Sequence, residues 1–375
     1  MQKDQESAAP DARSAGNEQG AQPGRRYRQR PPGSTWGDFG EDDQLGRVNL
    51  IDRHKVLQAV AEVKTGQSFC LSLPLDLPGS NVLNPRRHPP QLTPTVRQGV
   101  PNWVYETRRE VERASDVVND DRVSLWLQYS TQWDSLAHVG ALFDANGDGV
   151  AEPVFYNGYR AAQTFSLRSL SPEERAARPG FEQVSKAQAL GVEHLARHGM
   201  QGRGVLLNLR KTLGDARTVV GYDLLRSLLD QQGVALEEAD MLCLYTGFSQ
   251  ILLQWAGSPD AAQIHRMGAA LDGRDTRLQQ FLSDARISAL IADNYAVEHL
   301  GSEPFAARDT PADCALLPLH QHCLFKLGVP LGELWYLHEL AEELERQGRH
   351  RFLLTAPPLR LPGAVGSPVT PIATL

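Results

Sequence analysis

The stretch Gln128-Tyr-Ser-Thr-Gln-Trp-Asp-Ser-Leu-Ala-His138 places an amide, a carboxylate and an imidazole within a few positions of one another. If residues 130 to 134 are extended, alternate side chains share a face, so Gln132 and Asp134 point the same way. His138 follows across a turn of small residues. These side chains form a candidate ligand set for a metal ion, with an imidazole available for catalysis. On spacing alone, the more common interpretation is that Asp134 is a cap near a strand end and that His138 is a hydrogen-bonded histidine partly in the core.

The size and composition favour a globular protein with a large core. The chain of 375 residues could form one large domain or two, and its hydrophobic content is 41%. A formal net charge of −7 argues against a nucleic-acid binder, which needs a basic face. There is neither an apolar run of the roughly 20 residues that cross a bilayer nor a signal-peptide pattern. We therefore expect a cytoplasmic protein with no nucleic-acid or membrane partner. The cysteines show no CxxC pattern and predict free thiols: Cys70, Cys243, Cys314 and Cys323.

The order of predicted elements is that of an α/β protein. Residues 1 to 33 lack hydrophobic periodicity and predict a disordered tail, ahead of a single domain over residues 34 to 375. A helix is predicted from Asp52, a suitable N-cap, to Gly66. Residues 76 to 120 are rich in Pro, Asn and Arg and predict a long excursion, suited to substrate-facing loops or subunit contacts. The other predicted elements are strands 68–75, 123–129, 205–209, 241–245, 287–292 and 352–354, and helices 186–198, 223–232, 276–284 and 333–347. Strands that alternate with helices in this way are typical of α/β folds.

Two glycine-rich motifs favour turns over ligand sites. Asp144 to Gly149 looks like the first half of a calcium loop, but its twelfth position is Phe155 rather than the glutamate that such a loop needs. Gly202 and Gly204 precede a predicted strand instead of following one, so they form no phosphate cradle.

The quoted stretch resembles the signature His-x-Gly-Thr-His-x-Asp-x-Pro-x-His of the metal-dependent cyclase and arylformamidase-like hydrolases. Thr131, Asp134 and His138 match it. Four positions depart from it: Gln128, Ser130, Gln132 and Leu136. The resemblance is to the longer-chain members, which include kynurenine formamidase-like and isatin hydrolase-like proteins. It extends over about residues 36 to 345 through the stretches Trp36–Gly37, Asp42–Asn49, Tyr156–Gly158, Gly202–Asn208, Leu244–Phe248, Ala292–Glu298, Leu319–His320 and Gly328–Trp335.

This resemblance implies a fold and a set of site residues. The fold is a single α/β domain around a mixed sheet with barrel-like curvature and flanking helices, of the swivelling β/β/α type. It is usually a homo-oligomer, a dimer or a tetramer. Asp134 and His320 would bind metal, with His322 open as the alternative histidine. His138 would act as acid or base, and Glu333 would be its partner or a metal ligand. We expect Glu333 at the start of a helix, where the macrodipole favours an anion.

Two glutamines distinguish this chain from the resembling family. Gln128 and Gln132 stand where the signature has two imidazole ligands. A carboxamide oxygen is a harder and weaker zinc ligand than imidazole. The expected results are one ion in place of two, lower zinc affinity, a shift towards manganese or magnesium, or complete loss of the metal.

The function implied by the resemblance is hydrolysis of a cyclic amide, or of an aryl or acyl amide, by a water activated on a divalent ion, manganese or zinc. His138 would protonate the departing nitrogen, since an imidazole has an unperturbed pKa of about 6.5. The substrate would be a small molecule and no organic cofactor is expected. Nearby aromatic residues indicate an aromatic or planar ligand: Trp103, Trp126, Trp133, Phe155 and Tyr156. Two alternatives stay open. The protein could be a catalytically inactive family member that binds a small molecule or serves in assembly, or it could be a metal-dependent cyclase or dehydratase.

Overall fold

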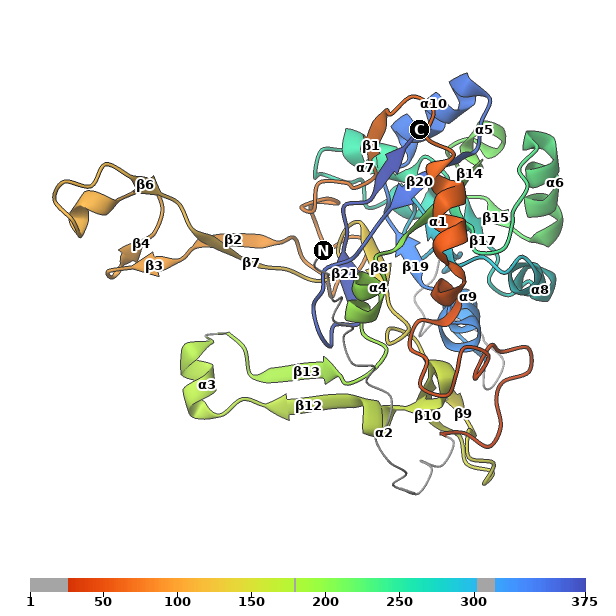
Figure 1. Ribbon diagram of the computed structural model, residues 1–375, viewed down its shortest axis with the longest axis horizontal. Helices are drawn as coiled ribbons and strands as arrows, with labels where there is room; N and C mark the ends of the chain where they lie inside the picture. The colour runs from red at the N-terminus through yellow and green to blue at the C-terminus, as the bar shows by residue number, and fades with distance from the viewer. Residues whose placement is uncertain (1–25, 179, 302–313) are drawn as a thin grey trace, which may run out of the picture.

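The protein is built around one mixed sheet that curls into a half-barrel (Figure 1). The computed structural model describes residues 26–178, 180–301 and 314–375. In spatial order the nine strands of the sheet are β1 (Ser68–Cys70), β22 (Ile372–Thr374), β20 (Arg351–Thr355), β14 (Gln201–Asn208), β16 (Met241–Tyr245), β18 (Ala289–Ala292), β19 (Leu331–Glu333), β8 (Gln132–Asp134) and β21 (Gly366–Pro368). The predicted α/β class and barrel-like curvature are therefore confirmed.

The centre of the sheet is parallel and buried on both faces. β14, β16, β18 and β19 run in the same direction, and Leu290 of β18 aligns with Leu242 on one side and Leu331 on the other. Because a parallel strand covered on both faces has no solvent side, β16, β18 and residues 205–207 of β14 are continuous apolar runs. Successive residues enter different cores: Leu244 and Leu290 lie in one cluster, whereas Cys243 and Ile291 lie in the other.

Helices cover both faces of the sheet. One face is packed by α6, α8 and a π-helical segment, η6, and the other by α1, α4 and α10. The main helical elements are α1 (Arg53–Val60), α4 (Val192–His198), α5 (Arg210–Leu213), α6 (Tyr222–Gln232), α7 (Phe248–Gln254), α8 (Thr276–Asp284), α9 (Pro318–His320), η6 (Gln321–Leu327) and α10 (His338–Gln347). Asp52 caps α1 as predicted, since its side chain accepts from the backbone N–H of Lys55. No helix of the described residues is long and apolar enough to cross a membrane.

Two ribbons project from the sheet (Figure 1). The longer one occupies the predicted excursion and contains the pair β2 (Gln91–Pro94) and β7 (Asp121–Ser124). Its outer part holds β3 (Val96–Arg97), β4 (Val100–Pro101), β5 (Tyr105–Glu106) and β6 (Val117–Val118). The second pairs β12 (Phe165–Ser169) with β13 (Gln183–Ala187), joined through α3 (Pro172–Ala177). Both ends of the longer ribbon return to the sheet, so the ribbon delivers the chain into β8.

Smaller elements complete the described chain. They are η1 (Gly46–Leu50), η2 (Thr107–Arg109), β9 (Ala141–Phe143), β10 (Glu152–Phe155), η3 (Tyr156–Gly158), β11 (Tyr159–Arg160), α2 (Ala161–Thr164), β15 (Val219–Val220), η4 (Ile264–Arg266) and β17 (Ala270–Leu271). Most of the predicted disordered tail, residues 1–25, lies outside the described residues. Residues 26–33 contact the domain, where Tyr27 is buried with its ring 5.2 Å from that of Trp36.

Several predicted elements need correction. The helix from Asp52 ends at Val60 rather than at Gly66, and the strand predicted over 68–75 ends at Cys70. The helix predicted over 333–347 begins only at His338, because residues 331–333 pair as β19 with both β18 and β8. The strand predicted over 123–129 ends at Ser124 and belongs to the longer ribbon rather than the central sheet. The helix predicted over 186–198 is confined to α4, because β13 occupies the chain up to Ala187.

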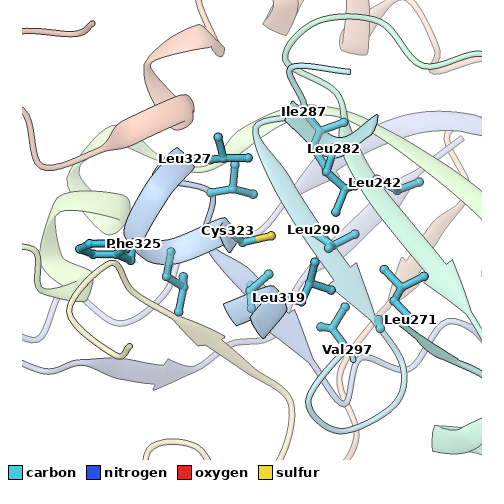
Figure 2. Packing of buried hydrophobic residues seen from close by; sticks show 14 of the residues in the cluster. Leu242, Leu271, Leu282, Ile287, Leu290, Val297, Leu319, Cys323, Phe325 and Leu327 are labelled. Carbon is cyan, nitrogen blue, oxygen red and sulfur yellow. The ribbon is translucent and has the colours of Figure 1, made fainter. Parts of the chain in front are cut away.

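The packing between β18 and the α9–η6 segment positions a histidine. Figure 2 shows Leu319 and Cys323 facing Leu290, with Val297 and Leu271 nearby. All of these side chains are buried. His320 follows Leu319 directly, so this core holds the backbone of the histidine against the sheet.

Candidate metal centre

Two neighbouring strands bring three polar side chains to one face. In the antiparallel pair β8 and β19, Gln132 aligns with Glu333, and Asp134 aligns with Leu331. Because side chains alternate along a strand, Gln132 and Asp134 share a face as the sequence predicted. The Gln132 amide donates a hydrogen bond of 3.0 Å from Nε2 to Oε2 of Glu333. Glu333 is thus held by a strand rather than by a helix N-terminus, and the predicted macrodipole effect does not apply.

The opposite face of these strands is anchored by two tryptophans. Trp133 and Trp335 meet edge to face with ring centroids 5.1 Å apart. Trp133 donates to the carbonyl oxygen of Ala356, and Trp335 to that of Gln132. Gly332 allows this contact, because a Cβ there would lie 2.8 Å from Nε1 of Trp335. The polar side chains therefore project from a rigid backbone.

Glu298 orients His320. One oxygen of Glu298 accepts from Nδ1 of His320 at 2.7 Å and from the backbone N–H of His320 at 2.9 Å. The other oxygen accepts from the backbone N–H of Leu319 at 3.0 Å. This leaves Nε2 of His320 directed at Oε1 of Glu333, 3.2 Å away. Burial lowers the pKa of His320, but the hydrogen bonds with Glu298 and Glu333 outweigh it and raise the pKa to about 10.

Asp134, His320 and Glu333 form a buried cluster with the geometry of a metal site. One ligand atom from each lies within 4.8 Å of the other two. Nε2 of His320 is 3.9 Å from Oδ2 of Asp134. Ligands about 2.1 Å from an ion, at about 90–110° to one another, are about 3.0–3.4 Å apart. The cluster is therefore close to the size that a first-row divalent ion requires.

The polar atoms of this cluster fit a cation. Both carboxylate oxygens of Asp134 and Oε1 of Gln132 are buried without a hydrogen-bond partner among the described residues. Burial raises the pKa of Asp134, and the neighbouring Glu333 adds to that rise. For Glu333, burial also acts to raise the pKa, but the hydrogen bond with His320 holds it below the usual value. Oxygen atoms that lack donors in a buried, acidic setting are suitable ligands for a divalent ion.

His138 and Gln128 stand beside the cluster. Nε2 of His138 lies 3.8 Å from Oδ1 of Asp134, and the histidine side chain keeps 22% of its surface exposed. The amide of Gln128 lies 3.4 Å from the other ring nitrogen of His138. Gln128 is therefore on the far side of the His138 ring from Asp134, whereas Gln132 lies next to Glu333. Among the residues that the structure describes, Glu333 forms hydrogen bonds with Gln132 and His320 and none with His138.

His322 points away from the cluster. Its Nε2 lies 3.1 Å from the hydroxyl oxygen of Ser283. Burial lowers the pKa of His322 to about 4. Of the two histidines that the sequence left open, His320 is the one that the fold brings to Asp134.

Other features identified in the sequence lie elsewhere. Asp144 accepts hydrogen bonds from the backbone N–H groups of Gly147, Asp148 and Gly149, which is a turn, as predicted. A surface hollow of about 410 Å³ lies between β14, α6 and α10, and none of its lining residues belongs to the cluster.

Sequence and structure comparisons identify the family. The family model described as "Putative cyclase" matches residues 88–299, more than half of the chain. The protein belongs to this cyclase family, as the signature predicted. A solved structure described as that of a novel cyclase is 27% identical with a TM-score of 0.67, and the match covers 92% of this chain and all 100% of that one. The similarity therefore extends over almost the whole fold.

Other solved structures are more distant. Isatin hydrolase A from Labrenzia aggregata, solved with benzyl benzoate, is 12% identical with a TM-score of 0.49, covering 85% of this chain and 98% of that one. A structure described as that of a predicted metal-dependent hydrolase from Bacillus stearothermophilus is 16% identical with a TM-score of 0.43. The match covers 82% of this chain and 97% of that one. No curated protein matches the sequence significantly.

Proposed function

We propose that the protein is a divalent-metal-dependent hydrolase that cleaves the C–N bond of a cyclic amide or of an aryl or acyl amide. The observation that carries this proposal is the buried carboxylate of Asp134, whose two oxygens lack donors among the described residues and lie beside His320 and Glu333. A buried carboxylate without hydrogen-bond donors is unfavourable, and a cation bound at that point would offset the cost.

The side chains of the cluster have separate tasks. Asp134, His320 and Glu333 would hold the ion, and Oε1 of Gln132 is available to join them. When bound, a divalent ion supplies Lewis acidity, which polarises a carbonyl oxygen and lowers the pKa of water from 15.7 to about 7. Glu298 fixes the ring orientation of His320, a role that hydrogen-bond partners of metal-binding histidines commonly have.

His138 is the proposed proton carrier. Its imidazole lies at the edge of the cluster and is partly exposed, so a substrate held there can reach Nε2. Nε2 would accept a proton as water adds to the carbonyl carbon and return it to the departing nitrogen. The Gln128 amide, 3.4 Å from Nδ1, supports the ring from the other side.

The proposed ion is manganese or zinc. Only one imidazole, that of His320, is in the cluster, and the remaining donors are oxygen atoms. Oxygen-rich sites suit manganese, whereas further imidazoles would favour zinc. Glutamine rather than histidine at position 132 therefore favours manganese over zinc.

Removal and return of the ion test the proposal. Protein stripped with EDTA is expected to hydrolyse none of a panel of cyclic amides and aryl formamides, and to regain hydrolysis with Mn²⁺ or Zn²⁺. His138→Gln is the matched variant. It is expected to keep the ion while losing about 10²–10⁴-fold in turnover. Hydrolysis that survives complete removal of metal would contradict the proposal. A metal-loaded protein that hydrolyses no member of the panel would instead favour the binding-protein alternative.

A further inference from the structure

Arg87 lies beside the candidate metal centre. It belongs to the segment between β1 and β2, and its Nη1 donates a hydrogen bond of 2.6 Å to the carbonyl oxygen of Gln128. The side chain of Gln128 contacts His138, which in turn faces Asp134. Three successive contacts therefore connect the guanidinium to the carboxylate of Asp134.

The charge of Arg87 is not neutralised by a carboxylate. Among residues 26–178, 180–301 and 314–375, no acidic side chain forms an ion pair with it. The half-buried Arg349, by comparison, pairs with Glu62 at 3.3 Å. A guanidinium has five N–H donors, and within the described part of the chain those of Arg87 have one acceptor, the carbonyl oxygen of Gln128. Arg87 is thus half-buried, and its guanidinium still has N–H donors with which to bind both oxygens of a carboxylate.

The field of Arg87 reaches the cluster. The positive charge of Arg87 interacts electrostatically with the carboxyl groups of both Asp134 and Glu333. A guanidinium in this place repels a divalent ion held by Asp134. An anionic group between the guanidinium and the ion would be attracted by both and would remove the repulsion.

An aromatic pair flanks Arg87. His88, the next residue, lies against Trp126 with ring centroids 4.9 Å apart and the planes at 59°. Trp126 is 39% exposed and lies two residues before Gln128. An apolar ring could therefore rest here while a carboxylate attached to it meets the guanidinium.

We infer that Arg87 is a specificity-determining residue that binds a carboxylate of the substrate. The amides cleaved at the metal centre are then anionic molecules that carry a carboxylate on an aromatic ring. This inference rests on the proposed function and adds the substrate class to it. Bidentate geometry makes arginine better suited than lysine to this task, since the guanidinium matches the two carboxylate oxygens.

Binding of matched aromatic probes tests the inference. The probes are 4-fluorobenzoate and its neutral counterpart 4-fluorobenzamide. Each is titrated with the full chain loaded with Mn²⁺, and binding is measured from the broadening of its ¹⁹F line. Arg87→Gln is expected to weaken 4-fluorobenzoate at least about tenfold, as loss of a charge-assisted hydrogen bond should. The same variant should leave Mn²⁺ content and 4-fluorobenzamide unchanged. Arg87→Lys keeps the positive charge but cannot donate two parallel hydrogen bonds, so its affinity for 4-fluorobenzoate should be intermediate.

Arg122→Gln is the control, because Arg122 is an exposed arginine of the longer ribbon, where its Nε donates to the hydroxyl oxygen of Thr93. It should change neither probe. Unchanged benzoate binding in both Arg87 variants, or wild-type protein that holds Mn²⁺ but binds no benzoate, would overturn the inference and leave the proposed function standing. If Arg87→Gln does not fold, the Arg87→Lys comparison decides. Wild-type protein that takes up no Mn²⁺ would overturn both the proposed function and the inference.

Discussion

Glu298→Gln separates the orientation of His320 from the presence of the histidine itself. In the native protein the carboxylate of Glu298 accepts three N–H groups, two from His320 and one from Leu319, at 2.7–3.0 Å. Glutamine has the same shape but only one acceptor oxygen. If that oxygen keeps both bonds to His320, the amide nitrogen faces the N–H of Leu319, and a buried donor is left without an acceptor.

The size of the effect follows from these contacts. One unsatisfied buried donor costs about 1–3 kcal/mol of the free energy of unfolding. Loss of the carboxylate behind a metal-binding histidine lowers metal affinity by about 10–100-fold. We therefore expect Glu298→Gln to fold with reduced stability and to bind Mn²⁺ at least about tenfold more weakly than wild type.

Calorimetric titration of the stripped protein with Mn²⁺ measures the affinity, and urea unfolding of the same metal-free samples measures the stability. Glu345→Gln on α10 is the control, because it removes the same charge from an exposed ion pair with Lys211. It should leave the affinity for Mn²⁺ unchanged. A Glu298→Gln protein that loses stability yet binds Mn²⁺ within about twofold of wild type would refute the role assigned to Glu298.

Three further changes have defined outcomes. Burial raises the pKa of Asp293 from 3.8 to about 6. Because the folded state then binds the proton more tightly than the unfolded state, the free energy of unfolding should fall by up to about 3 kcal/mol as the pH rises from about 4 to about 6. Urea unfolding should show this loss in wild type and not in Asp293→Asn, and equal pH slopes would contradict it. Leu290→Ala, in the core beside Leu319 and Cys323, should lower the free energy of unfolding by about 2–5 kcal/mol; a loss below about 1 kcal/mol would mean that the site collapses around the cavity. Gln132→His should raise the affinity for zinc relative to manganese in a competition titration, since imidazole is the softer ligand; an unchanged ratio would show that position 132 does not contact the ion.

Local patterns predicted most of the sheet and part of the site. The apolar runs that lie within β14, β16 and β18 were recognisable because strands buried on both faces are rich in apolar residues. The shared direction of Gln132 and Asp134 followed from the alternation of side chains along a strand. Both predictions depend only on neighbouring residues, which is why the sequence was sufficient.

Long-range pairing decided what the sequence could not. Glu333 was predicted to begin a helix, but Leu331 to Glu333 form a strand that pairs with β8, some 200 positions away in the chain, and with β18. The choice between His320 and His322 depended on how α9 and η6 pack against the sheet. Glu298 and Arg87 received no role from the sequence, although Glu298 follows a buried strand, where functional side chains of α/β proteins commonly lie.

Elemental analysis of protein purified without chelators, wild type beside Asp134→Asn, tests the metal centre most directly. We predict close to one manganese or zinc ion per chain in the wild type and its loss in the variant, because Asp134 supplies the buried oxygens that lack other partners. A wild-type protein with no bound metal, and with none taken up on titration, would contradict the metal centre and the hydrolase proposed from it.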